Sequence, residues 1–216
     1  MKNLFLTTIS ISFLTIITSC GGGNETATEN EVKDTVIAEP ACKYSYNHST
    51  TGVYWTAFKF TEKTGVKGRF DSIEVSGYSD NVETVTDLVH STSFTIYTSS
   101  INSDNPERDQ KIVESFFGKM MNTSTITGTV MGIMDNTATI KLKLNDVEKE
   151  VTGNVSMEGE VVKINVALNM NDFNGQDAIT SLNKVCNDLH KGTDGKSVLW
   201  PDVEVMIETT LNKTCE

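Results

Sequence analysis

Clusters of basic residues are absent from this chain, which carries 18 lysines and arginines against 29 aspartates and glutamates and has a net charge of −11. Without a basic patch, the chain lacks the electrostatic footprint of a nucleic-acid-binding protein. An acidic surface also disfavours direct docking on anionic lipid headgroups. Beyond Cys20, no apolar run has the roughly 20 residues that a transmembrane helix needs. The sequence therefore predicts a water-soluble domain with no nucleic-acid partner.

The signatures of common enzymes and metal sites are also missing. The chain has no nucleophile elbow, no His-Glu-x-x-His, no phosphate-binding loop and no Cys-x-x-Cys pair. Its histidines are His48, His90 and His190, and His190 follows Cys186 by about one helical turn. This pair could supply two metal ligands, but a structural zinc site needs four. The alternative is a core cysteine beside an exposed histidine. We expect no enzymatic activity, no cofactor and no bound metal.

The N-terminal residues have the pattern of a secretory signal. Lys2 precedes the apolar stretch 4–17, which is too short to cross a bilayer. The stretch is followed by Thr18-Ser19-Cys20, which resembles the lipobox, where small residues precede a cysteine that is acylated before the signal is removed. We expect residues 1–19 to be a lipoprotein signal peptide and Cys20 to be the lipidated residue. The alternative is an ordinary cleaved signal followed by an accidental cysteine.

Residues 20–40 predict a flexible acidic tether. Three glycines follow Cys20, and the acidic residues of the segment are opposed by the single basic residue Lys33. Such a composition buries too little apolar surface to offset the entropy of ordering its backbone. A flexible coil of about 20 residues reaches roughly 25 Å. We expect a protein of the cell envelope, periplasmic or on the outer-membrane surface, that is held at the membrane by its N-terminal acyl anchor.

Residues 41–216 predict one β-rich domain, because apolar, β-branched and aromatic residues recur there with a period of two. Eight strands are expected, at 53–60, 69–78, 92–101, 125–134, 137–144, 149–157, 161–170 and 202–211. Asp135-Asn136, Asn145-Asp146 and Glu158-Gly159 suit tight hairpin turns between them. Eight strands with short turns favour a closed antiparallel barrel, which leaves no exposed edge.

Two helices interrupt the strands. Pro106 suits a first helical position after Asn105, a good capping residue, and an apolar stripe follows between Ile112 and Phe117. A second helix is expected at about 176–189, with Gly192 where a helix stop belongs. The predicted fold class is therefore all-β with two helices.

Several separated blocks resemble the YceI-like family of secreted polyisoprenoid-binding proteins. They are 53–60 with Gly68-Arg69-Phe70, 100–103 with Glu107-Arg108-Asp109 and Phe117, 142–152, and 171–174. The chain departs from the family at Asp146, where the hairpin turn usually has glycine. It also carries residues 182–202, which look like the helix-and-loop insertion of a lipoprotein branch of the family. We expect this insertion to cap or narrow the barrel.

The resemblance implies a lipocalin-like, eight-stranded antiparallel barrel whose interior binds a long isoprenoid or fatty chain, with no cofactor. A barrel of about eight strands is either filled by side chains or just wide enough for one small ligand. By parity with the inward face of the family, the residues expected to line the cavity are Val53, Trp55, Ala57, Phe70, Phe94, Ile96 and Phe117. The alternative is that they are plain core packing in a ligand-free structural or stress-related surface lipoprotein.

Three charged residues admit more than one role. Lys59 shares a strand face with Trp55 and could bind a pyrophosphate or carboxylate headgroup at the barrel mouth, since a buried ammonium is costly unless paired. Equally, it could reach solvent from the strand end. Arg108 and Asp109 could form a charged gate or headgroup contact. The structural alternative is an ion pair at a helix start, where the Asp109 carboxylate complements the helix dipole.

Three cysteines remain once Cys20 is assigned to the lipid, an odd number in an oxidising compartment. In an up-and-down barrel the first and last strands are antiparallel neighbours, which places Cys42 beside Cys215. We expect a Cys42–Cys215 disulfide and a reduced Cys186 in the core. A bridge from Cys186 is the alternative, and it would pin the second helix to one end of the barrel.

Overall fold

Antiparallel strands make up almost half of residues 41–216, the part of the chain that the computed structural model describes. The predicted signal peptide at 1–19, the predicted tether at 20–40 and the predicted lipidation site Cys20 lie outside the described residues. Ten strands form one sheet in the order β4-β5-β7-β8-β9-β10-β11-β2-β3-β6. Their bounds are β2 Gly52–Lys59, β3 Thr64–Phe70, β4 Ile73–Ser76, β5 Ser93–Tyr97, β6 Ile101–Asn102, β7 Thr125–Met134, β8 Thr137–Leu144, β9 Val147–Glu158, β10 Val161–Asn169 and β11 Leu199–Thr210.

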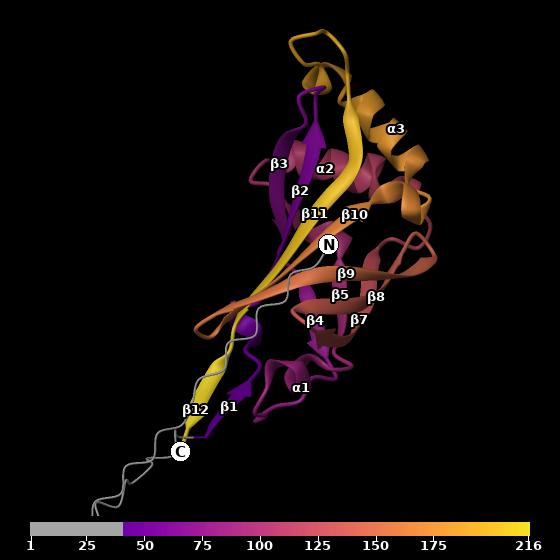
Figure 1. Cartoon of the computed structure of the whole chain (residues 1–216). Coiled ribbons are helices and arrows are strands. Elements are labelled where there is room, and N and C mark those ends of the chain that lie inside the picture. Colours follow the sequence, from indigo (N-terminus) through magenta and orange to yellow (C-terminus); the bar gives the residue numbers. More distant parts are fainter. Residues whose placement is uncertain (1–40) are drawn as a thin grey trace, which may run out of the picture. The chain divides into compact units, whose positions relative to one another are not determined.

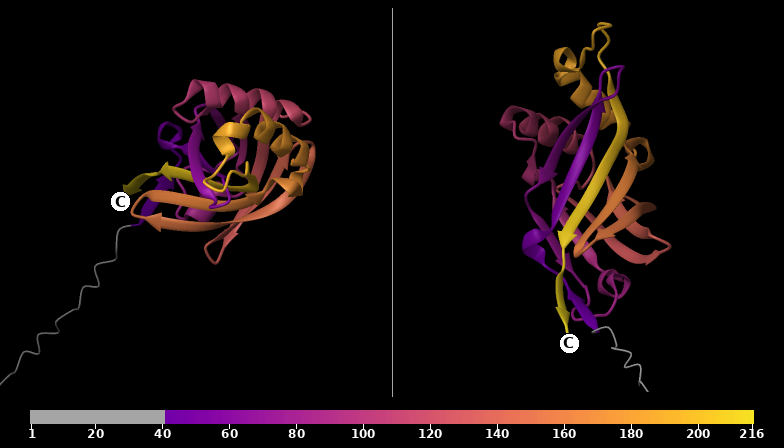
Figure 2. Two further views of the ribbon diagram at one scale, coloured as in Figure 1. Left: turned by 90° about the horizontal axis from the view of Figure 1, so that it is seen from above. Right: turned by 60° about the vertical axis from the view of Figure 1, so that its left-hand side comes forward.

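The two ends of this sheet meet and close it into a barrel. Strand β3 continues into β4 after two residues, and β5 continues into β6 through a short 3-10 helix. Strand β3 pairs with β6 and β4 pairs with β5, so the two kinked strands run side by side. Between the two paired stretches, the Asp71 and Tyr97 amides donate to the Ser100 and Ser72 carbonyls at 3.0 and 3.1 Å. When each kinked pair is counted as one strand, the predicted eight-stranded antiparallel barrel is confirmed, and the sheet curls back on itself in Figure 2.

The strand bounds differ from the prediction at the kinks. The expected strand 69–78 begins five residues earlier, at Thr64, and breaks after Phe70; the expected strand 92–101 breaks after Tyr97. Two of the three predicted hairpin turns lie where they were expected. Asp135 and Asn136 have φ of 48° and 59°, and Asn145 and Asp146 have φ of 53° and 56°. Positive φ at both central residues is the geometry that matches the twist of a two-stranded hairpin.

The described residues contain three α-helices rather than the two predicted. They are α1 Val85–Val89, α2 Pro106–Ser115 and α3 Gln176–Val185. Helix α1 was missed because it has a single buried residue, Leu88, and is too short for a periodic pattern. Helix α2 is capped as predicted, since Asn105 accepts from the Arg108 amide at 3.0 Å. The expected second helix ends early, and a 3-10 helix at Asn187–His190 follows it. No helix in residues 41–216 is long and apolar enough to span a membrane.

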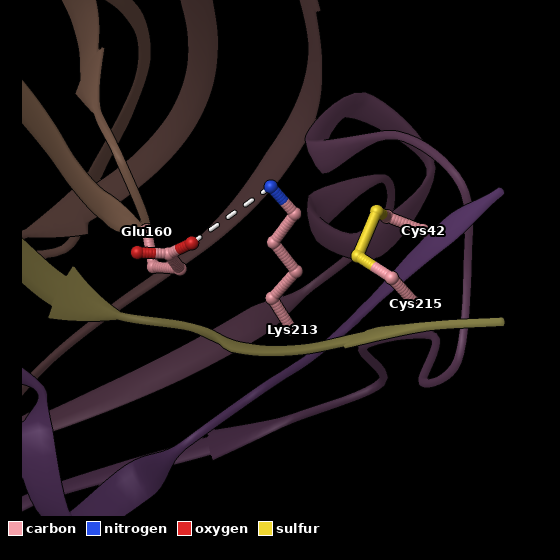
Figure 3. The surroundings of a disulfide bond; sticks show 4 residues. All are labelled: Cys42, Glu160, Lys213 and Cys215. Carbon is pink, nitrogen blue, oxygen red and sulfur yellow. Dashed lines mark ion pairs between the residues drawn. A yellow bond between two sulfur atoms is a disulfide. The ribbon is translucent and has the colours of Figure 1, made fainter. Parts of the chain in front are cut away.

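A two-stranded ribbon extends the barrel at the end opposite helices α2 and α3 (Figure 1). It consists of β1 Cys42–Ser45 and β12 Asn212–Cys215, with Cys42 directly opposite Cys215. The two cysteines form a disulfide, and Cys186 is a buried free thiol, so both cysteine predictions are confirmed (Figure 3). The nearby ion pair between Lys213 and Glu160, at 3.8 Å, is exposed and contributes little to stability.

Candidate functional site

Large aromatic side chains enter the barrel where the neighbouring strand offers a glycine. Trp55 on β2 lies opposite Gly68 on β3, and Phe94 on β5 lies opposite Gly128 on β7. A Cβ atom at either glycine would collide with the facing ring. The absence of a side chain at each glycine therefore leaves room for the ring against the neighbouring strand.

An apolar cavity of about 160 Å³, here called the barrel chamber, occupies the interior toward α1. Of the predicted ligand-contacting residues, Val53, Phe70, Phe94 and Ile96 lie on its wall. Leu88 of α1 also lines it, at the α1 end. Aliphatic and aromatic side chains form nearly all of the lining, so the chamber offers little to a polar ligand and suits a hydrocarbon.

A second apolar cavity of about 120 Å³, the helix chamber, lies beneath α2 and α3. Trp55, Ala57 and Phe117 line it. The ring of Phe117 packs edge-on against that of Phe116, with 5.2 Å between centroids. The helix chamber shares Phe70 and four other wall residues with the barrel chamber, so the two cavities adjoin along the barrel. The two chambers together are called the apolar route, because they adjoin and only side chains separate them.

A third cavity of about 240 Å³, the vestibule, lies between β2, α2 and the end of α3. It shares Trp55, Ala57, Ile112, Leu182 and Leu199 with the helix chamber. Its remaining lining is different in kind, because it includes the cations Lys59, Arg108 and Lys111 with the single carboxylate Glu107. The vestibule is therefore the charged end of an otherwise apolar route.

Lys59 is held in place by an uncharged partner. Its Nζ donates to the Leu189 carbonyl at 3.0 Å and lies 4.5 Å from the centre of the Phe60 ring. Partial burial, and then the nearby Arg108 guanidinium, lower the pKa of Lys59. Both effects disfavour a positive charge, so an anion placed in the vestibule would stabilise the charged form of Lys59.

The insertion 182–202 forms one wall of the vestibule and also docks on the tip of the β2–β3 hairpin. Trp200 Nε1 donates to the Phe60 carbonyl at 2.7 Å, and Thr61 donates to Asp194 at 2.8 Å. Leu182, Cys186 and His190 face the vestibule from this segment. The added helix and loop therefore contribute to the candidate site.

Cys186 and His190 are buried and lie beside the cations. Burial raises the pKa of the Cys186 thiol. Burial, followed by the charge of Lys59, lowers the pKa of His190 to about 4. The expected exposed histidine is wrong, because the His190 side chain is 8 % exposed and its Nδ1 lies 2.9 Å from the Asn183 carbonyl oxygen. Nowhere in residues 41–216 do three or more His, Cys, Asp or Glu side chains cluster as a metal site.

Arg108 and Asp109 have separate roles. Asp109 accepts from the Ser103 amide at 2.9 Å and from the Ser103 hydroxyl at 2.5 Å, which ties the start of α2 to the strand before it. Within residues 41–216 the Arg108 guanidinium donates only to the Ser103 carbonyl, at 3.4 Å, and it lines the vestibule. The structural interpretation therefore holds for Asp109, whereas Arg108 belongs to the candidate site.

All eight predicted ligand-contacting residues lie on the walls of these three cavities: Val53, Phe70, Phe94 and Ile96 on the barrel chamber, Trp55, Ala57, Phe70 and Phe117 on the helix chamber, and Lys59 on the vestibule. That they contact a ligand stays a prediction. Trp55 lies between the helix chamber and the vestibule. Lys111 and His190 were not predicted as site residues, because the fold alone brings α2 and the insertion against the end of β2.

Comparisons with known proteins agree with this architecture. A model of the family described as YceI-like domain matches residues 44–211. The structure of a polyisoprenoid-binding domain from Saccharophagus degradans, implicated in plant cell wall breakdown, is similar with a TM-score of 0.57 at 15 % identity over 81 % of this chain and 99 % of that one. BcnA of Burkholderia cenocepacia is similar with a TM-score of 0.50 at 12 % identity, over 79 % of this chain and 99 % of that one. No curated protein matches the chain.

Proposed function

The chain belongs to the YceI-like domain family, and on that premise we propose that its barrel binds a long apolar chain, polyisoprenoid or fatty, outside the cytoplasm. The observation that carries this proposal is the pair of adjoining apolar chambers that run along the barrel. A polyisoprenoid-binding domain from Saccharophagus degradans has the same fold, which adds support. Binding without catalysis fits these two chambers, because aliphatic and aromatic side chains form nearly all of their walls among the described residues.

The size of the chambers limits how a chain can be held. A dry cavity of about 150 Å³ accommodates a molecule the size of benzene. The barrel and helix chambers, at about 160 and 120 Å³, together fall just short of the ~300 Å³ at which ligand pockets usually begin. A long chain therefore has to displace the side chains between the chambers or leave part of its length in the vestibule.

Affinity would come from burying the chain. Each buried methylene contributes about 0.8 kcal/mol, so a modest length overcomes the cost of association. Selectivity among apolar chains should be poor, because an apolar wall distinguishes one methylene by only ~1–3 kcal/mol.

Location is part of the same proposal. We infer that residues 1–19 are removed, that Cys20 is acylated, and that the domain is anchored to a membrane of the cell envelope by this lipid. The basis is the lipobox-like Thr18-Ser19-Cys20 after a short apolar stretch. An anchor by acylation also suits a chain whose net charge of −11 gives it no attraction to anionic headgroups.

The second candidate is a ligand-free structural or stress-related surface lipoprotein. The modest volume of each chamber favours it, since small apolar voids also occur in filled barrels. Native mass spectrometry of the purified chain separates the two functions. We expect a co-purified lipid mass, or uptake of an added fluorescent isoprenoid. A clean ligand-free mass together with no uptake would leave the ligand-free candidate.

Ala57→Phe tests whether the interior is open. Ala57 faces both the helix chamber and the vestibule, so a phenyl ring there should occupy the route. We expect the variant to lose at least about tenfold in isoprenoid uptake while its free energy of unfolding stays within ~1 kcal/mol of the wild type. Overpacking a solid core would instead cost ~1–3 kcal/mol.

Ala167→Phe is the matched control, because Ala167 lies on the exposed face of β10. It should keep both uptake and stability. A destabilised Ala57→Phe variant, in a protein whose wild type takes up no lipid, would show that the barrel is solid.

A further inference from the structure

Three cations converge on the vestibule from two elements. Lys59 comes from the end of β2, and Arg108 and Lys111 come from successive turns of α2. None of the ion pairs formed within residues 41–216 includes any of them. The one carboxylate on the vestibule wall, Glu107, is exposed in the first turn of α2.

The three side chains line one cavity together with the Cys186 thiol. The charge of Arg108 lowers the pKa of Lys59, and the charges of Lys111, Lys59 and Arg108 all act on the Cys186 thiol. All three cations are partly buried, while the hydrogen bonds of Lys59 and Arg108 go to backbone carbonyls. Partial burial of cations that form no ion pair is energetically costly. An anion bound in the vestibule would therefore stabilise their charged forms.

The vestibule opens onto the apolar route. It shares wall residues with the helix chamber, which in turn shares wall residues with the barrel chamber. Trp55 and Ala57 lie at the boundary, where a polar headgroup would give way to a hydrocarbon tail. A molecule that fits both environments has one anionic end and one long apolar end.

We propose that the vestibule binds the anionic headgroup, carboxylate or phosphate, of an amphiphile whose apolar chain occupies the helix and barrel chambers. This inference rests on the proposed function and adds the class of ligand and its orientation. The Arg108 guanidinium matches the two oxygens of a carboxylate or phosphate, and Lys59 and Lys111 supply ammonium donors. At about 240 Å³ the vestibule has room for either headgroup with water.

The test compares ligands that differ only in their headgroup. Oleic acid is paired with oleyl alcohol, and farnesyl phosphate with farnesol, each titrated against the purified full chain. We expect each anion to bind roughly 10- to 100-fold more tightly than its alcohol, the range that a charge-assisted hydrogen bond gives. The preference should fall as ionic strength rises. The tighter of the two anions identifies the headgroup.

Two triple variants test whether the three vestibule cations cause the preference for anions over alcohols. In K59Q/R108Q/K111Q, the anions should bind no better than the alcohols, while alcohol binding stays as in the wild type. The control K141Q/K149Q/K163Q removes the same charge from exposed ion pairs outside the vestibule and should keep the full preference. Lys111 makes no hydrogen bond or ion pair within residues 41–216, so K111Q alone should fold normally and lose part of the preference.

Each outcome has a distinct meaning. If the alcohols bind as tightly as the anions, the inference is overturned while the proposed function stands. A preference that survives in K59Q/R108Q/K111Q overturns it as well. Inorganic phosphate alone should bind far more weakly than farnesyl phosphate, and equal binding would show that no tail enters the barrel. If none of the four amphiphiles binds, the proposed function itself fails.

Discussion

At the residue scale, Asn145 links three parts of the barrel rim. Its carbonyl oxygen accepts from the Met121 amide at 2.6 Å, and its amide nitrogen donates to the Phe173 and Asn174 carbonyls at 2.8 and 3.1 Å. It also has φ of 53° in the β8–β9 turn and is buried. One side chain therefore satisfies backbone groups of two other segments while its own backbone makes the turn.

Replacing Asn145 with glycine keeps the backbone conformation but removes these hydrogen bonds. Because buried backbone groups lose their partners, we expect a loss of about 2–4 kcal/mol in the free energy of unfolding, measured by urea denaturation. Asn145→Ala should lose about 1 kcal/mol more, since alanine is strained at positive φ. The control is Asn136→Gly, at φ of 59° in the exposed β7–β8 turn, which should change stability by less than ~0.5 kcal/mol. Equal effects of the two glycine variants would contradict this role.

His190 makes the stability of the domain sensitive to mild acid. Its pKa falls from an ordinary value of 6.5 to about 4 on folding, so above pH 6.5 the side chain is neutral in both states. Between pH 6.5 and 4 the unfolded chain binds a proton that the folded chain does not, and stability is lost as the pH falls. We expect His190 to account for about 1–2 kcal/mol of this loss, after allowing for solvent screening.

The measurement is the free energy of unfolding at pH 7 and pH 4.5 for the wild type and for His190→Gln. Carboxylates contribute to the drop in both proteins, so only the difference between the two drops reports on His190. The wild type should lose more than the variant. Equal drops would show that His190 is accessible to protons in the folded state.

The sequence predicted those site residues that lie on the same strand as a recognised motif. Lys59 was found because it lies on the same face of β2 as Trp55. Lys111 was not, since its position depends on how α2 is rotated over the barrel end. His190 was expected to be exposed, whereas it ends a 3-10 helix that follows α3, where its buried ring lies against the Asn183 side chain.

At the element scale, turns were predictable and kinks were not. Asp-Asn and Asn-Asp pairs tolerate positive φ, so the residue types themselves indicated the β7–β8 and β8–β9 turns. The break between β3 and β4 has no such local cause. There, β3 pairs with β6 and β4 with β5 in registers that differ by two residues, and this offset depends on the tertiary closure of the barrel. Apolar residues alternate on both sides of the break, and its only mark in the sequence is the interval of three residues between Phe70 and Ile73.

The β1–β12 ribbon depends on its disulfide. Two strands alone are marginally stable in water, and every residue of β12 is exposed. The Cys42–Cys215 bond spans 173 residues, so in the chain-entropy model it stabilises the fold by up to about 5 kcal/mol, although measured values are often smaller. We expect the double variant Cys42→Ser/Cys215→Ser to retain the barrel with a lower denaturation midpoint.

Hydrogen exchange should show which part of the domain loses stability in the double variant. Ribbon amides should lose their protection in the double variant, whereas amides of the paired strands β8 to β11 should remain protected. Cys186→Ser serves as the comparison, because it removes a thiol without touching the ribbon. An unchanged midpoint in the double variant would mean that the disulfide contributes nothing to the stability of the fold.

At the scale of the whole molecule, the ribbon lies at the end opposite α2 and α3 (Figure 1), and residues of α2 and α3 line the vestibule. The described part of the chain begins at Ala41, immediately before the ribbon. A lipid at Cys20 would therefore be attached through the ribbon end, leaving the α2–α3 end with its three cations at the far side from the attachment point. In the proposed anchored form, the chain therefore enters the domain at the ribbon end.

Cys20→Ser tests the anchor on which this arrangement depends. Serine cannot form the thioether that carries the lipid, so we expect the variant to leave the membrane fraction or to accumulate as an unprocessed precursor. A single acyl chain binds membranes only marginally, so the mature wild type should carry more than one, and its mass after detergent extraction measures this. Cys186→Ser, which changes a buried free thiol in the domain to serine, should remain membrane-bound and fully processed. If Cys20→Ser is still processed and still fractionates with membranes, the chain is held there by another contact, and the tether at residues 20–40 would have to be interpreted without a lipid.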